Sequence, residues 1–518
     1  MCYLYPSYSG LQPEGLSKRI STENFAIKIF SVEEYIPKTN LRFLSIILSY
    51  MTPIPYKWLV AVVFIAGLFM NLMDMTIVNV ALPTLGKELH ANSATLEWVV
   101  NGYLLSMAIW IPASGWIGDK FGTKRIFLLS LTIFTLGSMF CGLSHTIESL
   151  IFFRVIQGIG GGMMTPVGTT MLFRAFPPAE RARASAVLAI PTALSPVLGP
   201  ILGGWLVEYT TWHWIFWVNV PIGITTFLFG AKFIKEYIEK DAGRFDFAGF
   251  FLSAGSLVLL LYALSRVPSA GWLDTQVILS SLSGIILLFL LIRIEKKTQK
   301  PILHFGLLKD RIFKSSNIIM FFAYSVWLGF LFILPLFLQQ FRDLSALTSG
   351  LVIAPQALGW IVISPIVSKF YPRLGPRFMA ITGLIGFMIT SLFFIFVNMY
   401  TSLWIISIIM FFRGLFMVFA MIPIQAAAFS NISQEEMGRA SSLFNTNRQV
   451  AASFGVAFLG AFLFQLSTVG STQLIAYQVT FLVTALLSLI AAVFAFTIKD
   501  ADARASMDEN YQKASVGE

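Results

Sequence analysis

Long apolar runs separated by short polar turns dominate the chain from Lys57 to Lys499. A helix needs about 20 apolar residues to cross a bilayer core. No run alternates with the two-residue period of a barrel strand, and backbone groups in lipid must pair internally, so each run predicts a membrane-spanning helix. The pattern predicts fourteen helices, at residues 57–82, 96–117, 126–144, 150–172, 184–207, 213–234, 247–265, 275–293, 316–339, 348–369, 378–397, 402–425, 440–465 and 473–497.

Composition supports the same class, an all-α integral membrane protein. Apolar residues make up 56% of the 518 residues and charged residues only 12%, whereas a soluble chain is typically about 25% charged. This excludes a string of soluble domains, and the apolar content excludes disorder. Cys2 and Cys141 lie far apart, so we expect two reduced thiols rather than a disulfide scaffold.

The basic residues predict the orientation of the helices. With both termini in the cytoplasm, the inward loops carry 21 Lys and Arg residues and the outward loops carry 3. Short cytoplasmic loops are enriched in Lys and Arg, so this split predicts cytoplasmic termini and an even number of spans. The net charge of +10 is therefore a topology signal spread over loops, and we expect no nucleic-acid partner.

We predict a cytoplasmic tail at each end of the chain, at residues 1–55 and 499–518. The first of these lacks the charged, apolar and small-residue order of a signal peptide, and its apolar residues 41–50 are too few to span. An alternative is that the mature protein begins at Met51. N-terminal sequencing decides between the two, because a first residue upstream of Met51 excludes the alternative.

One internal echo indicates two similar halves. Residues 180–185 and 436–441 share the pattern E-x-x-R-A-S, and Gly199 and Gly455 each follow the Ser by fourteen residues. Two halves in the same orientation are typical of transporters. The 256-residue separation exceeds a six-helix half and fits two extra helices. We therefore predict a six-helix bundle at 56–234, two inserted helices with linkers at 235–315, and a second six-helix bundle at 316–498.

Charged residues inside the predicted helices are candidates for function, because an intramembrane ion is costly. Asp74 is the only acidic residue deep inside an apolar run, and Arg154 should lie at a comparable depth, which permits an Asp74–Arg154 pair. Arg413 and Arg448 fall near mid-depth. The alternative for Asp74 is a structural hydrogen bond, and for each arginine it is a bond to helix carbonyls or to a polar neighbour.

The loop after the second predicted helix is a candidate gate. Residues 115–125 read GWIGDKFGTKR, with Gly115 and Gly122 permitting a tight turn. Asp119 can accept from a helix N-terminus or a loop cation, while Lys124 and Arg125 anchor the loop at the inner face. The cluster can latch an inner gate, and a plain topology anchor is the alternative.

The fifth predicted helix contains a stretch of small residues. Residues 195–204 read SPVLGPILGG, and small residues at such spacing let helices approach closely. Proline removes a backbone hydrogen bond and bends a helix. A hinge or a seal between the halves is one interpretation and plain packing is the other. The residues concerned are Ser195, Gly199, Pro200, Gly203 and Gly204.

The histidines His90, His145, His213 and His304 fall in or beside loops without metal spacing, and no nucleotide-binding loop is present. We therefore expect no cofactor, no metal and no enzymatic activity. Five polar residues in the predicted membrane region are candidates for a substrate cavity: Asn79, Gln157, Asn219, Arg413 and Arg448.

Five segments together resemble the major facilitator superfamily, and specifically its fourteen-helix drug:proton antiporters of the EmrB/QacA type. They are residues 73–83 (MDMTIVNVALP), 115–125, 154–158 (RVIQG), 195–204 and 212–221 (WHWIFWVNVP). The resemblance covers about residues 55 to 500. It implies a proton-coupled exporter in the inner (cytoplasmic) membrane that works by alternating access, with Asp74 and Arg154 coupling to protons and Asp119 with Arg125 gating.

Three departures from the family pattern bear on the substrate. Ser195 stands where the antiporter motif usually begins with Gly, His213 replaces an Arg, and Lys369 occupies a region where the second-half loop motif has Asp. Family members that export lipophilic cations often carry extra membrane acids, whereas Asp74 stands alone here. We therefore expect neutral or weakly acidic amphipathic substrates rather than lipophilic cations.

Other functions remain open from sequence. An importer on the same fold, or a dedicated exporter of a siderophore or metabolite, fits the same helices. A periplasmic adaptor protein is compatible with the resemblance, although no residue pattern encodes one. A membrane acyl or glycosyl transferase would need a clustered interfacial His or carboxylate site, which the sequence does not show.

Overall fold

The computed structural model describes residues 55–507 except 92, 240, 300 and 469–471. The predicted N-terminal tail, with the alternative start at Met51, and residues 508–518 of the C-terminal tail therefore lie outside the described residues. The secondary structure of the described residues is helical throughout, without a strand. Every predicted range overlaps a helix, as hydropathy alone leads one to expect.

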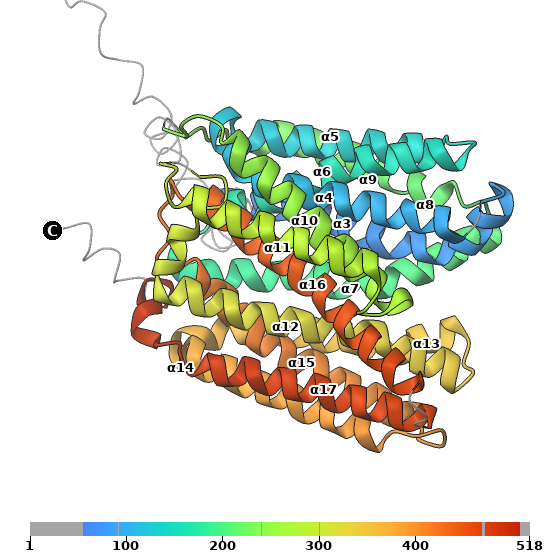
Figure 1. Cartoon of the computed structure of the whole chain (residues 1–518). Coiled ribbons are helices and arrows are strands. Elements are labelled where there is room, and N and C mark those ends of the chain that lie inside the picture. Colours follow the sequence, from blue (N-terminus) through green and yellow to red (C-terminus); the bar gives the residue numbers. More distant parts are fainter. Residues whose placement is uncertain (1–54, 92, 240, 300, 469–471, 508–518) are drawn as a thin grey trace, which may run out of the picture. The chain divides into compact units, whose positions relative to one another are not determined.

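The first half of the chain forms six long helices and one short one (Figure 1). Local chemistry sets their starts. Thr146 and Ser149 form a capping box at one, and the Glu236 carboxylate accepts from the backbone N–H groups of Lys124 and Arg125 at another. The helices are α3 (Tyr56–Glu88), α4 (Ser93–Phe121), α5 (Thr123–Cys141), α6 (Ile147–Ala175), α7 (Arg181–Tyr209), α8 (Trp214–Trp217) and α9 (Asn219–Phe233).

A helical hairpin follows, made of α10 (Phe247–Ala270) and α11 (Thr275–Glu295). Asp246 and Asp274 cap the two helices through backbone N–H groups. Helix α10 packs against α11, against α4 of the first half and against α16 of the second. Helix α11 packs mainly on α10, and its outer face exposes apolar side chains such as Leu282 and Phe289. The hairpin therefore lies beside both halves.

The second half repeats the pattern of long helices, from α12 to α17 (Figure 1). Gly375 interrupts α14 with φ 73° and ψ 160°, a conformation that favours glycine. The elements are α12 (Arg311–Leu336), η3 (Phe337–Phe341), α13 (Ala346–Ile353), α14 (Pro355–Phe393), η4 (Phe394–Phe396), α15 (Leu403–Ala428), α16 (Met437–Thr468), α17 (Gln473–Ala495) and η5 (Asp500–Ser506). Two further short helices lie in connections: η1 (Pro178–Glu180) between α6 and α7, and η2 (Phe305–Lys309) between α11 and α12.

Twelve helical stretches of the described residues are long and apolar enough to cross a membrane. One of them runs for 50 residues, Leu347–Phe396, and includes the break at Gly375. Helix α4, which has 29 residues, is not among the twelve. The fourteen predicted crossings therefore differ from the twelve stretches at these two places.

The E-x-x-R-A-S echo corresponds to a repeated helix contact. A Cβ on Gly199 of α7 would overlap Thr76 of α3, whose hydroxyl donates to the Ser195 carbonyl at 3.2 Å. A Cβ on Gly455 of α16 would likewise overlap the backbone of Ser325 in α12, whose hydroxyl donates to the Ala451 carbonyl at 2.9 Å. In both halves a glycine lets the repeat helix approach its partner closely.

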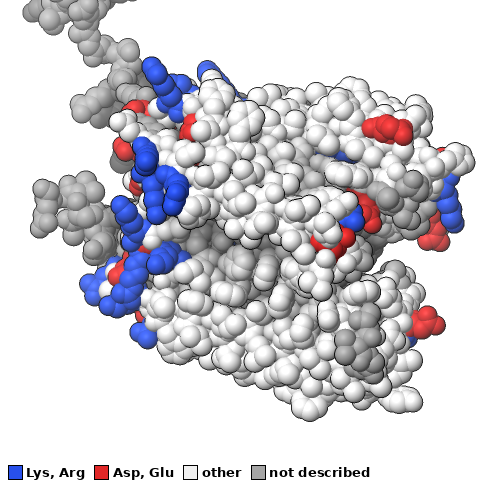
Figure 2. All heavy atoms as spheres, viewed as in Figure 1, with Lys and Arg blue, Asp and Glu red and all other residues white. Residues whose placement is uncertain are grey.

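The charged groups have an uneven distribution over the surface. Figure 2 shows Lys and Arg gathered at one end of the visible face, with a broad uncharged band beside them. Large apolar side chains are exposed along many helices, for example Phe152, Phe251 and Trp404. An uncharged apolar band next to a cationic end is the surface that a bilayer requires.

Candidate functional site

The Asp74 carboxylate lies in the core of the first half and accepts three side-chain hydrogen bonds. Arg154 Nη1 donates to Oδ2 at 2.5 Å, and Gln157 Nε2 and Asn219 Nδ2 donate to Oδ1 at 2.9 Å and 3.1 Å. Helices α3, α6 and α9 supply these residues, and each side chain is at most 1% exposed. An ionised carboxylate is stable in such a place only because these donors compensate its charge.

Further contacts hold the Arg154 guanidinium in place. Its Nε donates to the Val99 carbonyl at 3.0 Å, and its Nη1 also donates to Gln157 Oε1 at 2.9 Å. The guanidinium carbon lies 4.1 Å from the centre of the Tyr103 ring, and the Tyr103 hydroxyl donates to Asn71. The pair is thus embedded in a buried polar network that rests on four helices, so a change of charge at Asp74 is felt by all of them.

Arg413 of α15 is also fully buried, and it has no carboxylate partner among the described residues. Its guanidinium carbon lies 3.6 Å and 3.8 Å from the ring centres of Phe330 and Phe387, and it donates to the Ser391 hydroxyl. Aromatic faces stabilise a desolvated guanidinium. Arg413 therefore lies in the second-half core rather than in a cavity.

Arg448 of α16 lines a small cavity between the halves, of about 30 Å³. The guanidinium lies over the Tyr324 ring and donates to its hydroxyl. Gln425 and Trp360 line the same cavity, and the nitrogen atoms Gln425 Nε2, Trp360 Nε1 and Arg448 Nε are buried without a hydrogen-bond partner in the described part of the chain. The cavity wall therefore has a surplus of donors.

The predicted loop motif forms a contact between the halves at its Asp119. Arg174 of α6 donates to Asp119 Oδ1 at 2.9 Å and also to the Gln434 carbonyl at 2.8 Å, in the segment before α16. Burial raises the pKa of Asp119 to about 6, although the neighbouring Arg174 opposes that rise. Arg125 instead lies 3.6 Å from Glu236 and does not reach Asp119.

Two glycines let α4 and α16 approach each other closely beside Asp119. The Gly115 N–H donates to the Ser442 hydroxyl at 2.9 Å, which lies 3.1 Å from the Ser114 hydroxyl. A Cβ on Gly438 would lie 2.6 Å from the Asp119 carboxylate oxygens. Helices α4 and α16 are therefore in direct contact at this end. We name this contact the inner gate after the role that the sequence predicts for residues 115–125, and it comprises Ser114, Gly115, Asp119, Arg174, Gln434, Gly438 and Ser442.

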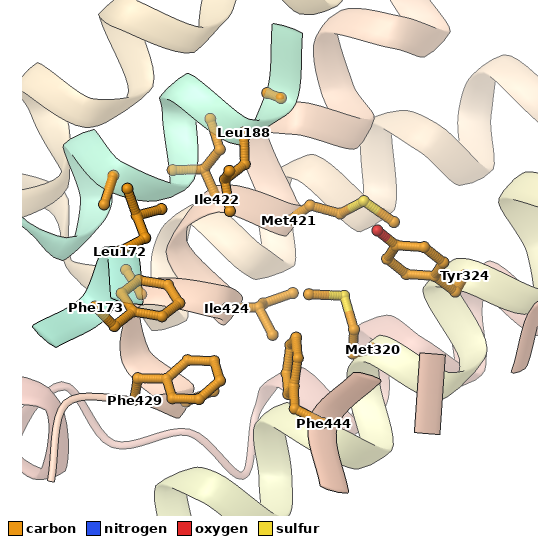
Figure 3. Packing of buried hydrophobic residues seen from close by; sticks show 14 of the residues in the cluster. Leu172, Phe173, Leu188, Met320, Tyr324, Met421, Ile422, Ile424, Phe429 and Phe444 are labelled. Atoms are coloured by element: carbon orange, nitrogen blue, oxygen red, sulfur yellow. The ribbon is translucent and has the colours of Figure 1, made fainter. Parts of the chain in front are cut away.

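Apolar side chains continue the closure next to the inner gate (Figure 3). Phe173 stacks on Phe429 with ring centres 4.5 Å apart, and Phe429 also contacts Phe444. Arg181 of α7 donates to the Phe429 carbonyl. Buried aromatic side chains from both halves thus pack against one another next to the inner gate.

Comparison with known proteins identifies the family. The family model described as Major Facilitator Superfamily matches residues 64–456. The chain belongs to the major facilitator superfamily. It is therefore a multi-pass membrane transporter of small molecules, built on that superfamily's helical fold.

Two relatives and one solved structure show what the chain is similar to. The chain is 34% identical over 395 residues to "Multidrug resistance protein B homolog" of Mycobacterium tuberculosis (strain CDC 1551 / Oshkosh), covering 76% of this chain and 73% of that one. It is 32% identical over 407 residues to "Putative multidrug resistance protein MdtD" of Citrobacter koseri, covering 78% and 85%. The crystal structure of the human organic anion transporter MFSD10 shares the fold, with a TM-score of 0.60 and 15% identity over 85% of this chain and 99% of that one.

The site residues predicted from the sequence do not form one site in this superfamily member. Asp74 and Arg154 are joined, together with Gln157 and Asn219, which we had expected in the substrate cavity. Asn79 is exposed and donates weakly to its own helix at 3.4 Å. The small-residue stretch of α7 packs against α3. A Cβ on Gly203 would overlap Ile77 of α3, whereas a Cβ on Gly204 would have room.

Several residues of the inner gate and of the Arg448 cavity were not predicted from the sequence. Arg174, Ser442 and Gln434 form the inner gate, and Trp360 and Gln425 line the Arg448 cavity. A signal for the gate was present, because Ser442 follows the second E-x-x-R-A-S copy directly. The aromatic and amide residues carry no such signal, because tryptophan is common at bilayer interfaces.

Proposed function

We propose that the chain is a proton-coupled exporter of amphipathic small molecules that works by alternating access. The observation that carries this proposal is the buried Asp74 carboxylate, which within the described part of the chain is compensated by Arg154, Gln157 and Asn219 alone. Protonation removes the charge that Arg154 binds and so weakens the network. A proton that moves inward through about 100 mV supplies about 2.3 kcal/mol, enough for roughly fifty-fold accumulation of a substrate.

Helix α7 links Asp74 to the cavity between the halves. Its Gly199 packs against Thr76, two residues from Asp74 on α3. About two to three turns earlier on α7, Thr192 and Ala189 line the cavity that also contains Arg448. A shift of α3 after protonation therefore moves a wall of the cavity directly.

The cavity supports neutral or weakly acidic substrates. Its unpaired nitrogen donors and Arg448 favour ligands rich in acceptor oxygens, and its aromatic walls favour flat apolar bodies. At about 30 Å³ it is far smaller than the roughly 300–1,000 Å³ of small-molecule sites, so the halves must separate to admit a substrate. The names of the multidrug resistance relatives agree with an exporter of this kind.

We also propose fourteen membrane crossings with both termini in the cytoplasm of the inner membrane. In the first half, Gly122 has a φ of 104° and Glu236 caps the next helix; in the second, Gly375 has a φ of 73° and Asp500 accepts from the Arg377 N–H at 2.9 Å. This match supports two crossings within Leu347–Phe396. The length of α4 and its packing on α6 support the other.

The decisive experiment is efflux by the Asp74→Asn variant. We expect inverted membrane vesicles with this variant to lose proton-driven dye and antibiotic uptake, because a neutral side chain cannot load and release a proton. Glu97→Gln, on the exposed surface of α4, is the matched control and should transport normally. Normal transport by Asp74→Asn at an equal membrane level would exclude Asp74 as the coupling site.

The same vesicles distinguish the alternatives. An importer would take up substrate in right-side-out rather than inverted vesicles. A dedicated siderophore or metabolite exporter would transport one compound and leave the rest of the panel unmoved. Collapse of the gradient by an uncoupler should stop transport in either case if protons drive it.

A further inference from the structure

A larger cavity lies outside the site described above, between the α10–α11 hairpin and the second half. Its volume is about 490 Å³, within the range of roughly 300–1,000 Å³ that holds a small molecule. Leucines from the hairpin form one wall and Phe321 and Phe322 of α12 form another. The hairpin thus stands away from α12 and α16 at this level, although α10 contacts α16 elsewhere.

The lining is apolar except at a few places, and two of these lack a partner. Asn317 and Thr446 line the cavity and are 6% and 8% exposed. The oxygen atoms Asn317 Oδ1 and Thr446 Oγ1 have no hydrogen-bond partner among the described residues. Buried polar atoms are normally satisfied, so these two indicate a ligand that brings a polar group into an otherwise oily space.

A cation lies at the same cavity, near the basic end of the molecule. Lys314 lines the cavity, is exposed, and forms no ion pair within the part of the chain that the structure describes. It lies one turn into α12. The positive-inside pattern counts it among the basic residues on the cytoplasmic side. In the proposed orientation its ammonium therefore lies at the level of the inner-leaflet headgroups, which are partly anionic.

We propose that this cavity binds an acyl chain of an anionic glycerophospholipid of the inner leaflet, with Lys314 holding the phosphate. The leucine and phenylalanine walls take the chain, and Thr446 and Asn317 face the polar atoms near the head. A head with hydroxyl groups, such as phosphatidylglycerol, also supplies the donor that Asn317 Oδ1 lacks. Because α10 contacts α4 and α16, the bound lipid supports a hairpin that touches both halves. The inference rests on the proposed orientation and not on proton coupling.

Native mass spectrometry of the delipidated full-length protein tests this directly. We expect phosphatidylglycerol to bind more tightly than phosphatidylcholine with the same chains. Lys314→Ala should weaken the phosphatidylglycerol complex about five-fold, the effect of one cation at the membrane surface, and leave phosphatidylcholine unchanged. Lys309→Ala is the matched control, because Lys309 at the end of η2 is exposed only five residues before Lys314 but does not line the cavity.

A second variant tests the cavity itself. Ser256 lies in its wall on α10, and among the described residues its hydroxyl donates to the Ser253 carbonyl of its own helix alone. Ser256→Leu should fill the space and weaken both lipids, whereas Ser256→Ala should bind as the unchanged protein does. Equal binding of the two lipids, equal losses in Lys314→Ala and Lys309→Ala, or unchanged binding by Ser256→Leu would each overturn the proposal. Because this readout is binding, it is independent of the efflux result for Asp74→Asn.

Discussion

At the scale of single residues, a buried arginine is stabilised by different partners in the two halves. Arg154 has a carboxylate at 2.5 Å, whereas Arg413 lies between Phe330 and Phe387. A buried charge that loses its partner is strongly destabilising, while an aromatic cage stabilises a cation without any acid. Only the first arrangement changes when a proton binds, and for this reason we place coupling in the first half.

A double-mutant cycle measures the Asp74–Arg154 interaction. Arg154→Gln should lower the free energy of unfolding by about 3–5 kcal/mol, because it leaves the Asp74 carboxylate buried and unpaired. Asp74→Asn combined with Arg154→Gln should lose clearly less than the sum of the single variants. Thermal unfolding in detergent gives these differences. Strict additivity would show that the two side chains are not coupled.

At the scale of helices, glycine sets how closely the repeat helices pack. The contact of α7 with α3 at Gly199 and that of α16 with α12 at Gly455 match each other, including a hydroxyl that donates to a carbonyl four residues before the glycine. Small residues are the general means by which membrane helices approach closely. The stretch at residues 195–204 therefore packs tightly, and a hinge there stays a prediction.

Two alanine substitutions on α7 test this packing. Gly199→Ala should destabilise the protein by about 1–3 kcal/mol, because its Cβ would overlap the Thr76 hydroxyl. Gly204→Ala is the matched control, since the nearest atom, Val80 Cγ1, would be 3.9 Å away. Thermal unfolding compares the two, and Thr76→Ala should partly restore Gly199→Ala. Equal melting temperatures for the two alanine variants would contradict tight packing at Gly199.

At the scale of the whole molecule, the halves meet at the inner gate. The Arg174–Gln434 hydrogen bond, the Gly115–Ser442 hydrogen bond and the Phe173–Phe429 stack all join first-half helices to α16 or to the segment between α15 and α16. In the proposed orientation this closes the cytoplasmic side. Transport then requires that these contacts break while the helices within each half stay together.

The inner gate should respond to pH. Burial raises the pKa of Asp119 to about 6 in the closed state, against the opposing effect of Arg174 and Arg439 and with a smaller contribution from Glu239. In an open gate the carboxyl meets water and its pKa returns towards 3.8. The closed state therefore binds the proton more tightly, so acidification through pH 6 stabilises closure. From about pH 7.5 to about pH 5.5 the closed population should gain about four-fold relative to the open one.

Spin labels across the inner gate measure this shift. Lys120 and Glu435 are exposed on either side, and after Cys2→Ser only the buried Cys141 remains as a native thiol. The short-distance population between labels at these positions should rise on acidification. Asp119→Asn should remove the dependence on pH. A distance distribution that is the same at both pH values would contradict the prediction.

The sequence by itself determined where the helices lie, the family and the identity of the coupling candidates. Hydropathy and loop charge are read from local composition, and a lone Asp74 in an oily run is visible without any neighbour. Depth along a helix also sufficed to suggest Asp74 with Arg154, because both positions are counted from the membrane boundary.

Only the tertiary structure decided which side chains meet. It joined Asp119 to Arg174 rather than Arg125, moved Gln157 and Asn219 from the expected cavity to Asp74, and opened a space beneath the hairpin at Lys314. The physical reason is that helices with similar apolar surfaces can face many neighbours in lipid. Which neighbour each takes depends on close packing at small residues and on the pairing of buried polar groups.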